Sequence, residues 1–419
     1  MQVKVLGAAR QVGRSAFMVS QGSTNILLDY GAMTSKEPGF PMHVQPKLVD
    51  GLVLSHAHLD HSGSTPVFFL GGDKVKLHAT PVTTELSNLL IEDFIKISGP
   101  YLPFEFIDLM AMNKATVNHP YKESFQIKDL TVTFYDAGHI PGSCITVVEG
   151  GGKRLIYTGD INGAETELLN GSYKDLGEAD MVITESTYAT ADHPARQAVE
   201  EAFVNHANEV VDRGGVLLAP AFSVGRAQEL AMTLVRHGFK HPIGMDGMAL
   251  KVNEVLMRYQ EYLRDPALFR RTLENTELIN GWSARRKFIQ KPGVIIAPAG
   301  MLVGGASVFY NQQLSQREKN GIALVSFQVP GTAGRTLLDR GLTLINGKPT
   351  KVKAEVKKFD FSSHSGKAVL SADLKAIKGD PKFMTVHGEE ESCIQLAKDL
   401  HTDLGVETYA PSVGEVYEV

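Results

Sequence analysis

Short apolar runs, punctuated by glycines and polar turns, dominate residues 1–190, and this pattern predicts β-strands. The strand candidates are VKVLGA, NILLDYG, GLVLSHAH, LTVTFYDAGH, CITVVEG, RLIYTGD and MVITEST. One helix is expected in this part of the chain, at 82–97, where VTTELSNLLIEDFIKI has helical spacing of apolar residues. The pattern therefore predicts packed β-sheets with helices on the outside.

A different pattern begins near residue 194. The stretch 194–215 opens with proline and closes with two glycines, and it places Val199, Ala202, Phe203 and Val210 on one helical face. The uninterrupted apolar runs GVLLAPAF and GVIIAPAG follow, each before a helical pattern, and IALVSFQ comes after them. Continuous apolar strands that alternate with helices are typical of a parallel α/β sheet covered on both faces.

After about residue 355 the chain returns to strands followed by polar turns, as in KFDFSSHSG and FMTVHGE. The last predicted element is an amphipathic helix capped by Gly405. Its apolar face is marked by Cys393, Leu396, Ala397, Leu400 and Leu404. We therefore expect one domain, formed by residues 1–190 and 356–419, with a second α/β domain, residues 191–355, inserted into it.

Composition narrows the class of protein. A chain of 419 residues exceeds the usual size of a single core, and none of its apolar runs is long enough to span a membrane. Its start does not resemble a signal peptide, and Cys144 and Cys393 are its only cysteines, which favours a reducing, cytoplasmic location. Any metal must then be held by histidine and carboxylate. The net charge of −5 does not indicate a nucleic-acid binder, and the basic stretches 285–291 and 351–358 are typical of solvated faces.

The stretch SHAHLDHSG, residues 55–63, places four potential metal ligands within six positions. These are His56, His58, Asp60 and His61. In a loop that leaves a strand, the first two can point to one side while the last two reach the other. Imidazole and carboxylate are suitable ligands for zinc, and a catalytic site needs fewer protein ligands than a closed structural one. The stretch therefore predicts a catalytic metal site.

Further candidates follow other apolar strands. They are His139 in DAGHIPGS, Asp160 in YTGDIN, His364 in FSSHSG and His387 in TVHGE. Each alone is more typical of a turn. Their shared position after a strand favours a common site, because sheets present functional groups at strand ends.

The stretch SHAHLDHSG, with Asp29 in NILLDYG and then His139 and Asp160 in order, resembles the metallo-β-lactamase superfamily. The second motif position is His58 and not glutamate, which resembles the zinc hydrolases more than the di-iron flavoproteins. The resemblance implies an αββα sandwich.

Four stretches, one just before the inserted part and three within it, resemble the β-CASP subgroup, which contains ribonuclease J and the cleavage and polyadenylation specificity factor nucleases. They are VITESTYA, PAFSVGRAQEL, APAGMLVGGAS and VPGTAGRTLLDRG. The subgroup motifs correspond to Glu185, His364 and His387, and a histidine at the last position is associated with RNA substrates. The resemblance implies an inserted Rossmann-like domain with a parallel sheet. The chain begins directly at the hydrolase domain, so we expect a short archaeal or bacterial factor.

The resemblance also implies two zinc ions. One is expected on His56, His58 and His139, the other on Asp60, His61 and His387, with Asp160 bridging both. Asp29 is expected to orient a ligand histidine, the alternative being a strand-end turn residue. His364 is expected as the general acid and Glu185 as its partner, and with Asp60 they form the expected catalytic set. The segment SGK follows His364 where relatives often carry Ala-Asp, which weakens any role assigned to the aspartate of that pair.

The implied activity is hydrolysis of single-stranded RNA to 5′-phosphate and 3′-hydroxyl ends, by a protein that can form a homodimer. Glycine-rich GMLVGG and GTAGR either bring backbone N–H groups to phosphates or form tight strand–helix turns. Ser363, Gly331 and Arg335 are candidates for substrate binding, and 285–291 with nearby Trp282 is a candidate RNA contact.

Two other functions remain open. One is a small-molecule metallo-hydrolase on the same fold, which would not need the inserted domain. The other is a non-catalytic RNA-binding or scaffold subunit of a processing complex, which would be expected to have lost metal ligands. The motifs do not distinguish endonuclease from 5′–3′ exonuclease.

Overall fold

The computed structural model describes residues 1–34, 37–70 and 75–419, and the chain divides into two compact units. The first unit comprises Met1–Glu165, Gly171–Asp192 and His364–Val419. The second comprises Thr166–Asn170 and His193–Ser363. Most of the second unit is therefore an insertion within the sequence of the first.

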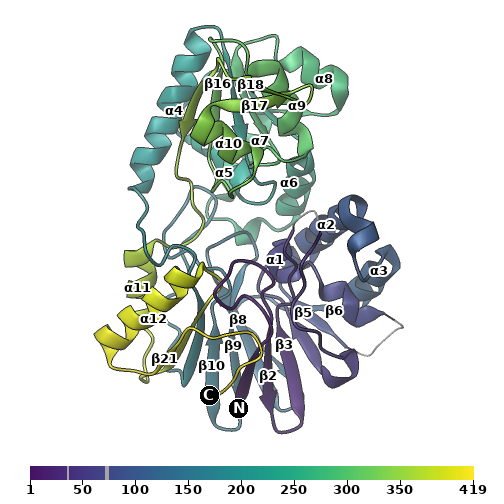
Figure 1. Cartoon of the computed structure of the whole chain (residues 1–419), viewed down its shortest axis with the longest axis vertical. Helices are drawn as coiled ribbons and strands as arrows, with labels where there is room; N and C mark the ends of the chain where they lie inside the picture. The colour runs from purple at the N-terminus through teal and green to yellow at the C-terminus, as the bar shows by residue number, and fades with distance from the viewer. Residues whose placement is uncertain (35–36, 71–74) are drawn as a thin grey trace. The chain divides into compact units, whose positions relative to one another are not determined.

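Two seven-stranded sheets form the centre of the first unit (Figure 1). One has the order β22 (Val416–Glu418), β1 (Gln2–Val5), β2 (Phe17–Gln21), β3 (Thr24–Leu28), β4 (Gly51–Val53), β5 (Leu77–Ala79), β6 (Thr116–Asn118). The other has the order β21 (Thr408–Tyr409), β20 (Lys382–Val386), β11 (Met181–Glu185), β10 (Lys153–Tyr157), β9 (Cys144–Gly150), β8 (Leu130–Asp136), β7 (Ser124–Ile127). Both are mixed, since β3 to β6 are parallel to one another, as are β10, β11, β20 and β21.

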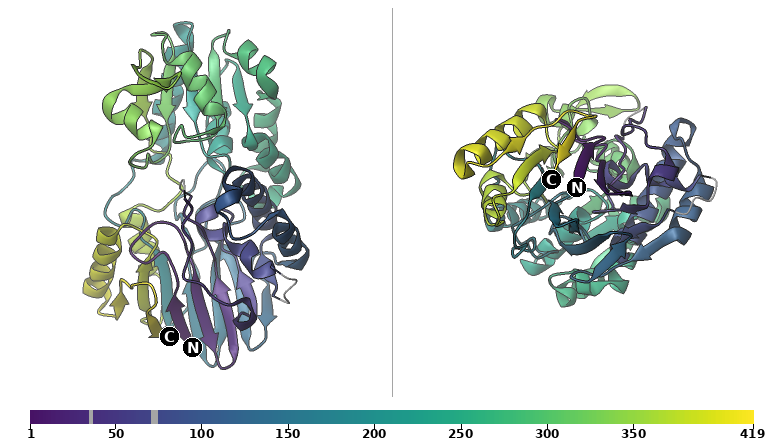
Figure 2. Two further views of the ribbon diagram at one scale, coloured as in Figure 1. Left: turned by 45° about the vertical axis from the view of Figure 1, so that its right-hand side comes forward. Right: turned by 90° about the horizontal axis from the view of Figure 1, so that it is seen from below.

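Apolar side chains from both sheets form one core between them, with Phe17 and Ile26 from one sheet and Phe134 and Leu155 from the other. Helices α2 (Pro81–Ser98) and α3 (Phe106–Ala115) pack on the outer face of the first sheet. Helices α11 (Lys367–Lys375) and α12 (Glu390–Leu404) pack on the outer face of the second. This four-layer arrangement confirms the αββα sandwich, and the N- and C-termini meet at one end of it (Figure 2).

The helices predicted in this unit form close to their expected positions. Helix α2 covers the stretch predicted at 82–97. Helix α12 ends at Gly405, whose φ of 71° is the left-handed conformation that glycine adopts easily. Leu404, expected on its apolar face, is exposed. Within the described ranges, no helix has both the length and the apolar character needed to cross a membrane.

The second unit is built on a six-stranded parallel sheet, as the apolar runs predict. Its order is β14 (Thr276–Ile279), β13 (Ile243–Asp246), β15 (Gly293–Ala297), β12 (Val216–Pro220), β16 (Gly321–Leu324), β19 (Glu355–Lys358). One face packs against α4 (Arg196–Asp212), α5 (Arg226–Arg236) and α6 (Met248–Arg258). The other packs against α8 (Gly281–Phe288), α9 (Gly305–Leu314) and α10 (Ala333–Arg340). Both faces of the sheet are covered, so the Rossmann-like expectation is confirmed.

Two details of this unit differ from the sequence-based expectation. Ala202 of α4 is exposed, because the buried stripe of that helix runs through Phe203, Ala207 and Val210. The return to the first unit, expected at residue 356, comes later. Strand β19 pairs with β16 and belongs to the inserted sheet, and the first unit resumes at His364.

Candidate metal centre

The histidine-rich stretch lies directly after β4. His56 is buried in the loop, and Asp60 and His61 belong to a single helical turn, α1 (Leu59–Ser62). His58 precedes that turn with extended backbone angles. The change from loop to helical turn separates the pair His56 and His58 from the pair Asp60 and His61, as the sequence predicts.

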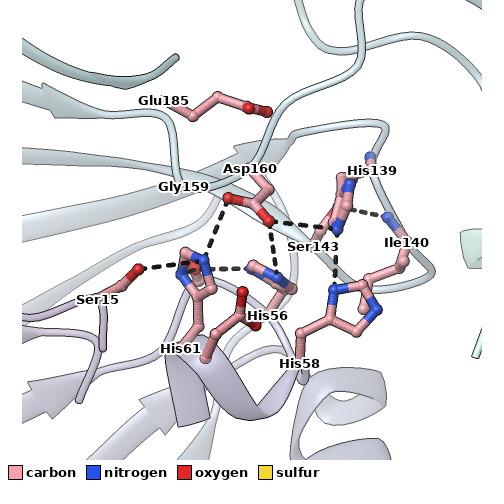
Figure 3. A network of polar contacts seen from close by, with 12 residues as sticks. Ser15, His56, His58, His61, His139, Ile140, Ser143, Gly159, Asp160 and Glu185 are labelled. Atoms are coloured by element: carbon pink, nitrogen blue, oxygen red, sulfur yellow. Dashed lines mark hydrogen bonds and ion pairs between the residues drawn. The ribbon is translucent and has the colours of Figure 1, made fainter. Parts of the chain in front are cut away.

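Asp160 lies at the centre of the histidine side chains (Figure 3). Its Oδ2 atom is 3.5 Å from Nε2 of His56 and 3.6 Å from Nε2 of His139. Its Oδ1 atom is 3.2 Å from Nε2 of His61 and 3.2 Å from Nδ1 of His387. One carboxylate therefore contacts four histidines from three separate segments of the chain.

Three groups of potential ligand atoms share Asp160, two of four residues and a smaller one that Asp160 forms with Glu185 and His364. In each group the atoms lie within 4.8 Å of one another. The first group contains His56, His58, His139 and Asp160, and the second contains Asp60, His61, Asp160 and His387. Nε2 of His139 is 3.1 Å from Nδ1 of His58, and Nε2 of His387 is 3.2 Å from Oδ2 of Asp60. All seven expected metal-ligating residues are therefore brought together.

Sharp backbone turns at the ends of strands direct several side chains toward the site. Asp29 follows β3 and His387 follows β20 directly, and both have left-handed φ angles, 58° and 48°. Such angles are uncommon outside glycine and often mark functional sites. Before Asp160, Gly159 also has a positive φ, and a Cβ atom there would lie 2.8 Å from Cβ of Ser55. The approach of Asp160 to the histidine loop therefore depends on that glycine.

Buried polar atoms at the centre suit a bound cation. Nε2 of His56, Oδ1 of Asp160 and Nδ1 of His387 are buried and have no hydrogen-bond partner among the described residues. A buried polar atom without a partner lowers the stability of the folded protein, unless a bound group such as a metal ion contacts it. A donor set of imidazole nitrogens and carboxylate oxygens is suitable for zinc. The residues present therefore fit a metal ion.

The electrostatics of the site favour a metal as well. Burial and the neighbouring His61 lower the pKa of His56 well below its ordinary value, and burial also lowers the pKa of His58. Burial opposes a charge on Asp160, but His387 and His61 outweigh it and lower the pKa of the carboxyl group. Neutral imidazoles and ionised carboxylates are the forms that bind metals. His61 differs, because burial opposes its charge but Asp160 and Asp29 outweigh burial and raise its pKa well above the ordinary value. A metal therefore has to displace a proton from His61.

Asp29 holds the imidazole ring of His61 by accepting a hydrogen bond from its Nδ1 atom. Its Oδ2 atom lies 2.7 Å from Nδ1 of His61 and accepts hydrogen bonds from the hydroxyls of Ser55 and Tyr157, both 2.7 Å away. Burial and the nearby Asp29 raise the pKa of Tyr157, so its hydroxyl keeps its proton. These contacts agree with the orienting role expected for Asp29. Tyr157 and Ser55 could not be recognised from the sequence, because both lie at the ends of strand-like apolar stretches.

We expect Tyr157→Phe to weaken metal binding about tenfold, because it removes one of the donors that hold Asp29 against His61. Chelator competition on the purified variant measures this affinity. Tyr30→Phe is a matched control, since Tyr30 is also buried and its hydroxyl donates to the backbone oxygen of Met42. An unchanged affinity in Tyr157→Phe would remove the tyrosine from the support of the site.

His364 and Glu185 form a pair beside the first group. Nδ1 of His364 lies 2.8 Å from Oε1 of Glu185, and the ring centroids of His364 and His139 are 4.5 Å apart. Glu185 is buried at the end of β11, where Oε1 accepts the backbone N–H of Ile161. Burial opposes a charge on His364, but the Glu185 carboxylate outweighs it and raises the histidine pKa to about 9. This pKa favours the protonated form of the histidine at neutral pH.

The three substrate-binding candidates all lie in the second unit. Gly331 has a φ of 85° just before α10, and Arg335 in that helix donates from Nε to Asp339. Ser363 is the last residue of the unit. A role for these residues in binding substrate remains a prediction.

Three family models match the chain. Residues 9–206 match the metallo-beta-lactamase superfamily, and residues 227–337 match the Beta-Casp domain. Residues 349–411 match a model described as a Zn-dependent metallo-hydrolase RNA specificity domain. The matches cover both units of the structure and support a metal cofactor.

Relatives extend over nearly the whole chain. RNase aCSPSF2 of Saccharolobus solfataricus is 37% identical over 99% of this chain and 84% of its own. Probable RNase MJ4 of Methanocaldococcus jannaschii is 32% identical over 99% of both chains, and ribonuclease TTHA0252 of Thermus thermophilus is 32% identical over 95% of both. A crystal structure of an Enterococcus faecalis protein of unknown function, 14% identical, shares the fold with a TM-score of 0.61 over 99% of both chains. The chain therefore belongs to the metallo-β-lactamase superfamily and, within it, to the β-CASP subgroup.

Proposed function

We propose that this protein is a metal-dependent ribonuclease that hydrolyses phosphodiester bonds of single-stranded RNA during RNA processing or decay. The observation that carries the proposal is a pair of ligand groups sharing Asp160 beside the His364–Glu185 pair. The similarity to RNase aCSPSF2 and to ribonuclease TTHA0252 supports RNA as the substrate. The match of residues 349–411 to an RNA specificity domain supports it independently.

We assign two zinc ions to the two groups. His56, His58 and His139 would hold one, Asp60, His61 and His387 would hold the other, and Asp160 belongs to both groups. When bound, two such ions lower the pKa of a water molecule and offset the negative charge of the phosphodiester. Asp29 keeps His61 in the orientation and tautomer that leave its Nε2 directed at the metal group.

His364 supplies the proton that the departing ribose oxygen needs. Glu185 accepts from Nδ1 of the protonated ring, so the second proton of the imidazolium is on Nε2. The raised histidine pKa keeps this acid protonated at neutral pH. Water is the nucleophile and the 2′-hydroxyl takes no part, so the products carry a 5′-phosphate and a 3′-hydroxyl.

The ligand set also bears on the two alternatives. A scaffold subunit has no need of seven converging ligands, and all seven are present in the two groups. A small-molecule hydrolase has no need of the inserted parallel-sheet unit, which here comprises most of residues 193–363. Both features favour the ribonuclease.

Single-stranded RNA labelled at either end tests the proposal. We expect fragments with 5′-phosphates and 3′-hydroxyls, and loss of cleavage when a chelator removes the metal, with recovery on adding zinc. Ligation of the fragments identifies their ends, and the ladder from each label separates internal from terminal cleavage. Cleavage that persists in chelator, or 2′,3′-cyclic phosphate ends, would contradict the proposal.

A further inference from the structure

The only tryptophan in the chain, Trp282, is exposed on the surface of the second unit. It occupies the second position of α8, the helix that follows β14. The side chain is 57% exposed. Tryptophan is enriched at binding interfaces, because its large apolar ring also carries a polar N–H group.

Neighbouring side chains fix the orientation of the indole ring. The guanidinium carbon of Arg285 lies 4.9 Å from the ring centroid, and the ring of Phe309 meets it edge-on at 5.3 Å. Arg285 is itself held by two hydrogen bonds to Asp246, of 2.6 and 2.9 Å, and Tyr310 donates to the same carboxylate. The ring is therefore braced before any ligand arrives, which reduces the entropy lost on binding.

The surroundings of Trp282 are strongly basic. Residues 281–291, GWSARRKFIQK, contain four basic residues and no acidic one, although the whole chain has a net charge of −5. Arg285 is paired with Asp246, whereas Arg286, Lys287 and Lys291 are exposed. This surface suits a partner that combines flat aromatic rings with repeated negative charges.

The position of α8 in the fold supports a binding role. In parallel α/β sheets, ligands bind at the carboxyl ends of the strands. Asp246, which holds Arg285, is the last residue of β13, and Trp282 comes three residues after β14 ends. Phe222 and Phe327, also exposed, follow β12 and β16 in the same way.

We propose that α8 is a binding platform for single-stranded RNA, with a base stacked on Trp282 and phosphates paired with Arg286 and Lys287. The proposal rests on the ribonuclease function and adds a contact surface outside the metal centre. Base–aromatic stacking beside a basic surface is the usual physical basis of single-strand binding without sequence preference. The exposed cations favour a nucleic acid over an apolar protein partner.

The single tryptophan makes the test direct, because intrinsic indole fluorescence reports on this surface alone. A short oligoadenylate is titrated into the His364→Ala variant, in which the substrate persists. We expect saturable quenching of the fluorescence at the concentrations where anisotropy of a labelled oligoadenylate shows binding. Binding by anisotropy with unchanged indole emission would overturn the proposal.

Variants in the same background measure the contribution of the ring. We expect Trp282→Ala to weaken oligoadenylate binding roughly tenfold and Trp282→Phe to restore most of it. The matched control is Leu344→Ala, which removes an equally exposed side chain, 53% open, from β17 (Leu342–Ile345) of the same unit. Equal affinity of Trp282→Ala and Leu344→Ala would overturn the proposal.

Salt dependence tests the phosphate contacts. Loss of two contacts to a single strand lowers the slope of log affinity against log salt by about 1.4. We expect this change in the double variant Arg286→Glu/Lys287→Glu and not in Lys348→Glu/Lys351→Glu, on β18 (Lys348–Lys351). Equal slopes would contradict the assigned contacts.

The outcomes separate this proposal from the ribonuclease function. If the wild type cleaves RNA while all platform variants bind RNA normally, the binding platform is wrong and the ribonuclease function stands. If the protein neither binds nor cleaves RNA, both proposals are wrong.

Discussion

Asp160→Asn is expected to abolish metal binding at one or both ligand groups and to lower RNA cleavage by at least about a thousandfold. Asp160 is the only residue common to the two groups of four, and its two oxygens face different pairs of histidines. An amide of the same shape keeps one weak acceptor and loses the negative charge. Metal content of the purified variant and its initial cleavage rate are the two measurements.

The control for this substitution is Asp180→Asn. Asp180 also lies beside a strand of the second sheet, where it accepts hydrogen bonds from Lys153 and from the backbone of Arg154, away from the ligand groups. Both variants are compared by thermal unfolding to establish that they fold. If Asp160→Asn retained full metal content and activity, the shared-carboxylate arrangement would be wrong.

The local part of the metal centre could be predicted from spacing alone. His56, His58, Asp60 and His61 are close in sequence, so one loop and one helical turn bring them together. His139, Asp160 and His387 are distant along the chain and could be placed only by their positions after strands and by the family resemblance. Their convergence depends on how two sheets pack, which no local pattern contains.

Tyr157 shows why other site residues could not be predicted. In the sequence it ends the apolar run RLIY, and its ring does pack in the core, 5.4 Å from the ring of Phe17. Its hydroxyl reaches Asp29 only because β3 and β10 belong to sheets that face each other. An aromatic residue with one polar atom gives the same pattern whether or not that atom has a partner.

The boundary of the inserted unit is hard to place from the sequence for a related reason. Strand β19 has the sequence EVKK, which lacks the apolar character of the central strands β12 and β15. It lies at the edge of the sheet, and edge strands often carry charged residues that prevent pairing with other chains. The periodicity that predicts a buried strand is therefore weakest at the edge, where the unit ends.

His364→Ala is expected to lower RNA cleavage by about 10²- to 10⁴-fold while leaving metal content unchanged. The ring contacts the Glu185 carboxylate and belongs to neither of the two four-residue groups around Asp160. The loss should be much smaller for bis(p-nitrophenyl) phosphate, because nitrophenolate leaves without a proton. Equal losses on RNA and on the nitrophenyl ester would exclude His364 as the acid.

Glu185→Gln tests how much the Glu185 carboxylate contributes to the pKa of His364. Burial alone would lower the pKa of His364, and Glu185 is the main group that raises it to about 9, so a neutral amide returns the pKa to a lower value. Activity that needs the protonated histidine is present below that pKa and is lost as the pH rises through it. The alkaline limb of the RNA cleavage profile should therefore move to lower pH in Glu185→Gln. It should stay in place in Glu149→Gln, which alters an exposed glutamate of β9 in the same sheet. An alkaline limb that is identical in the wild type and in Glu185→Gln would mean that another group supplies the proton.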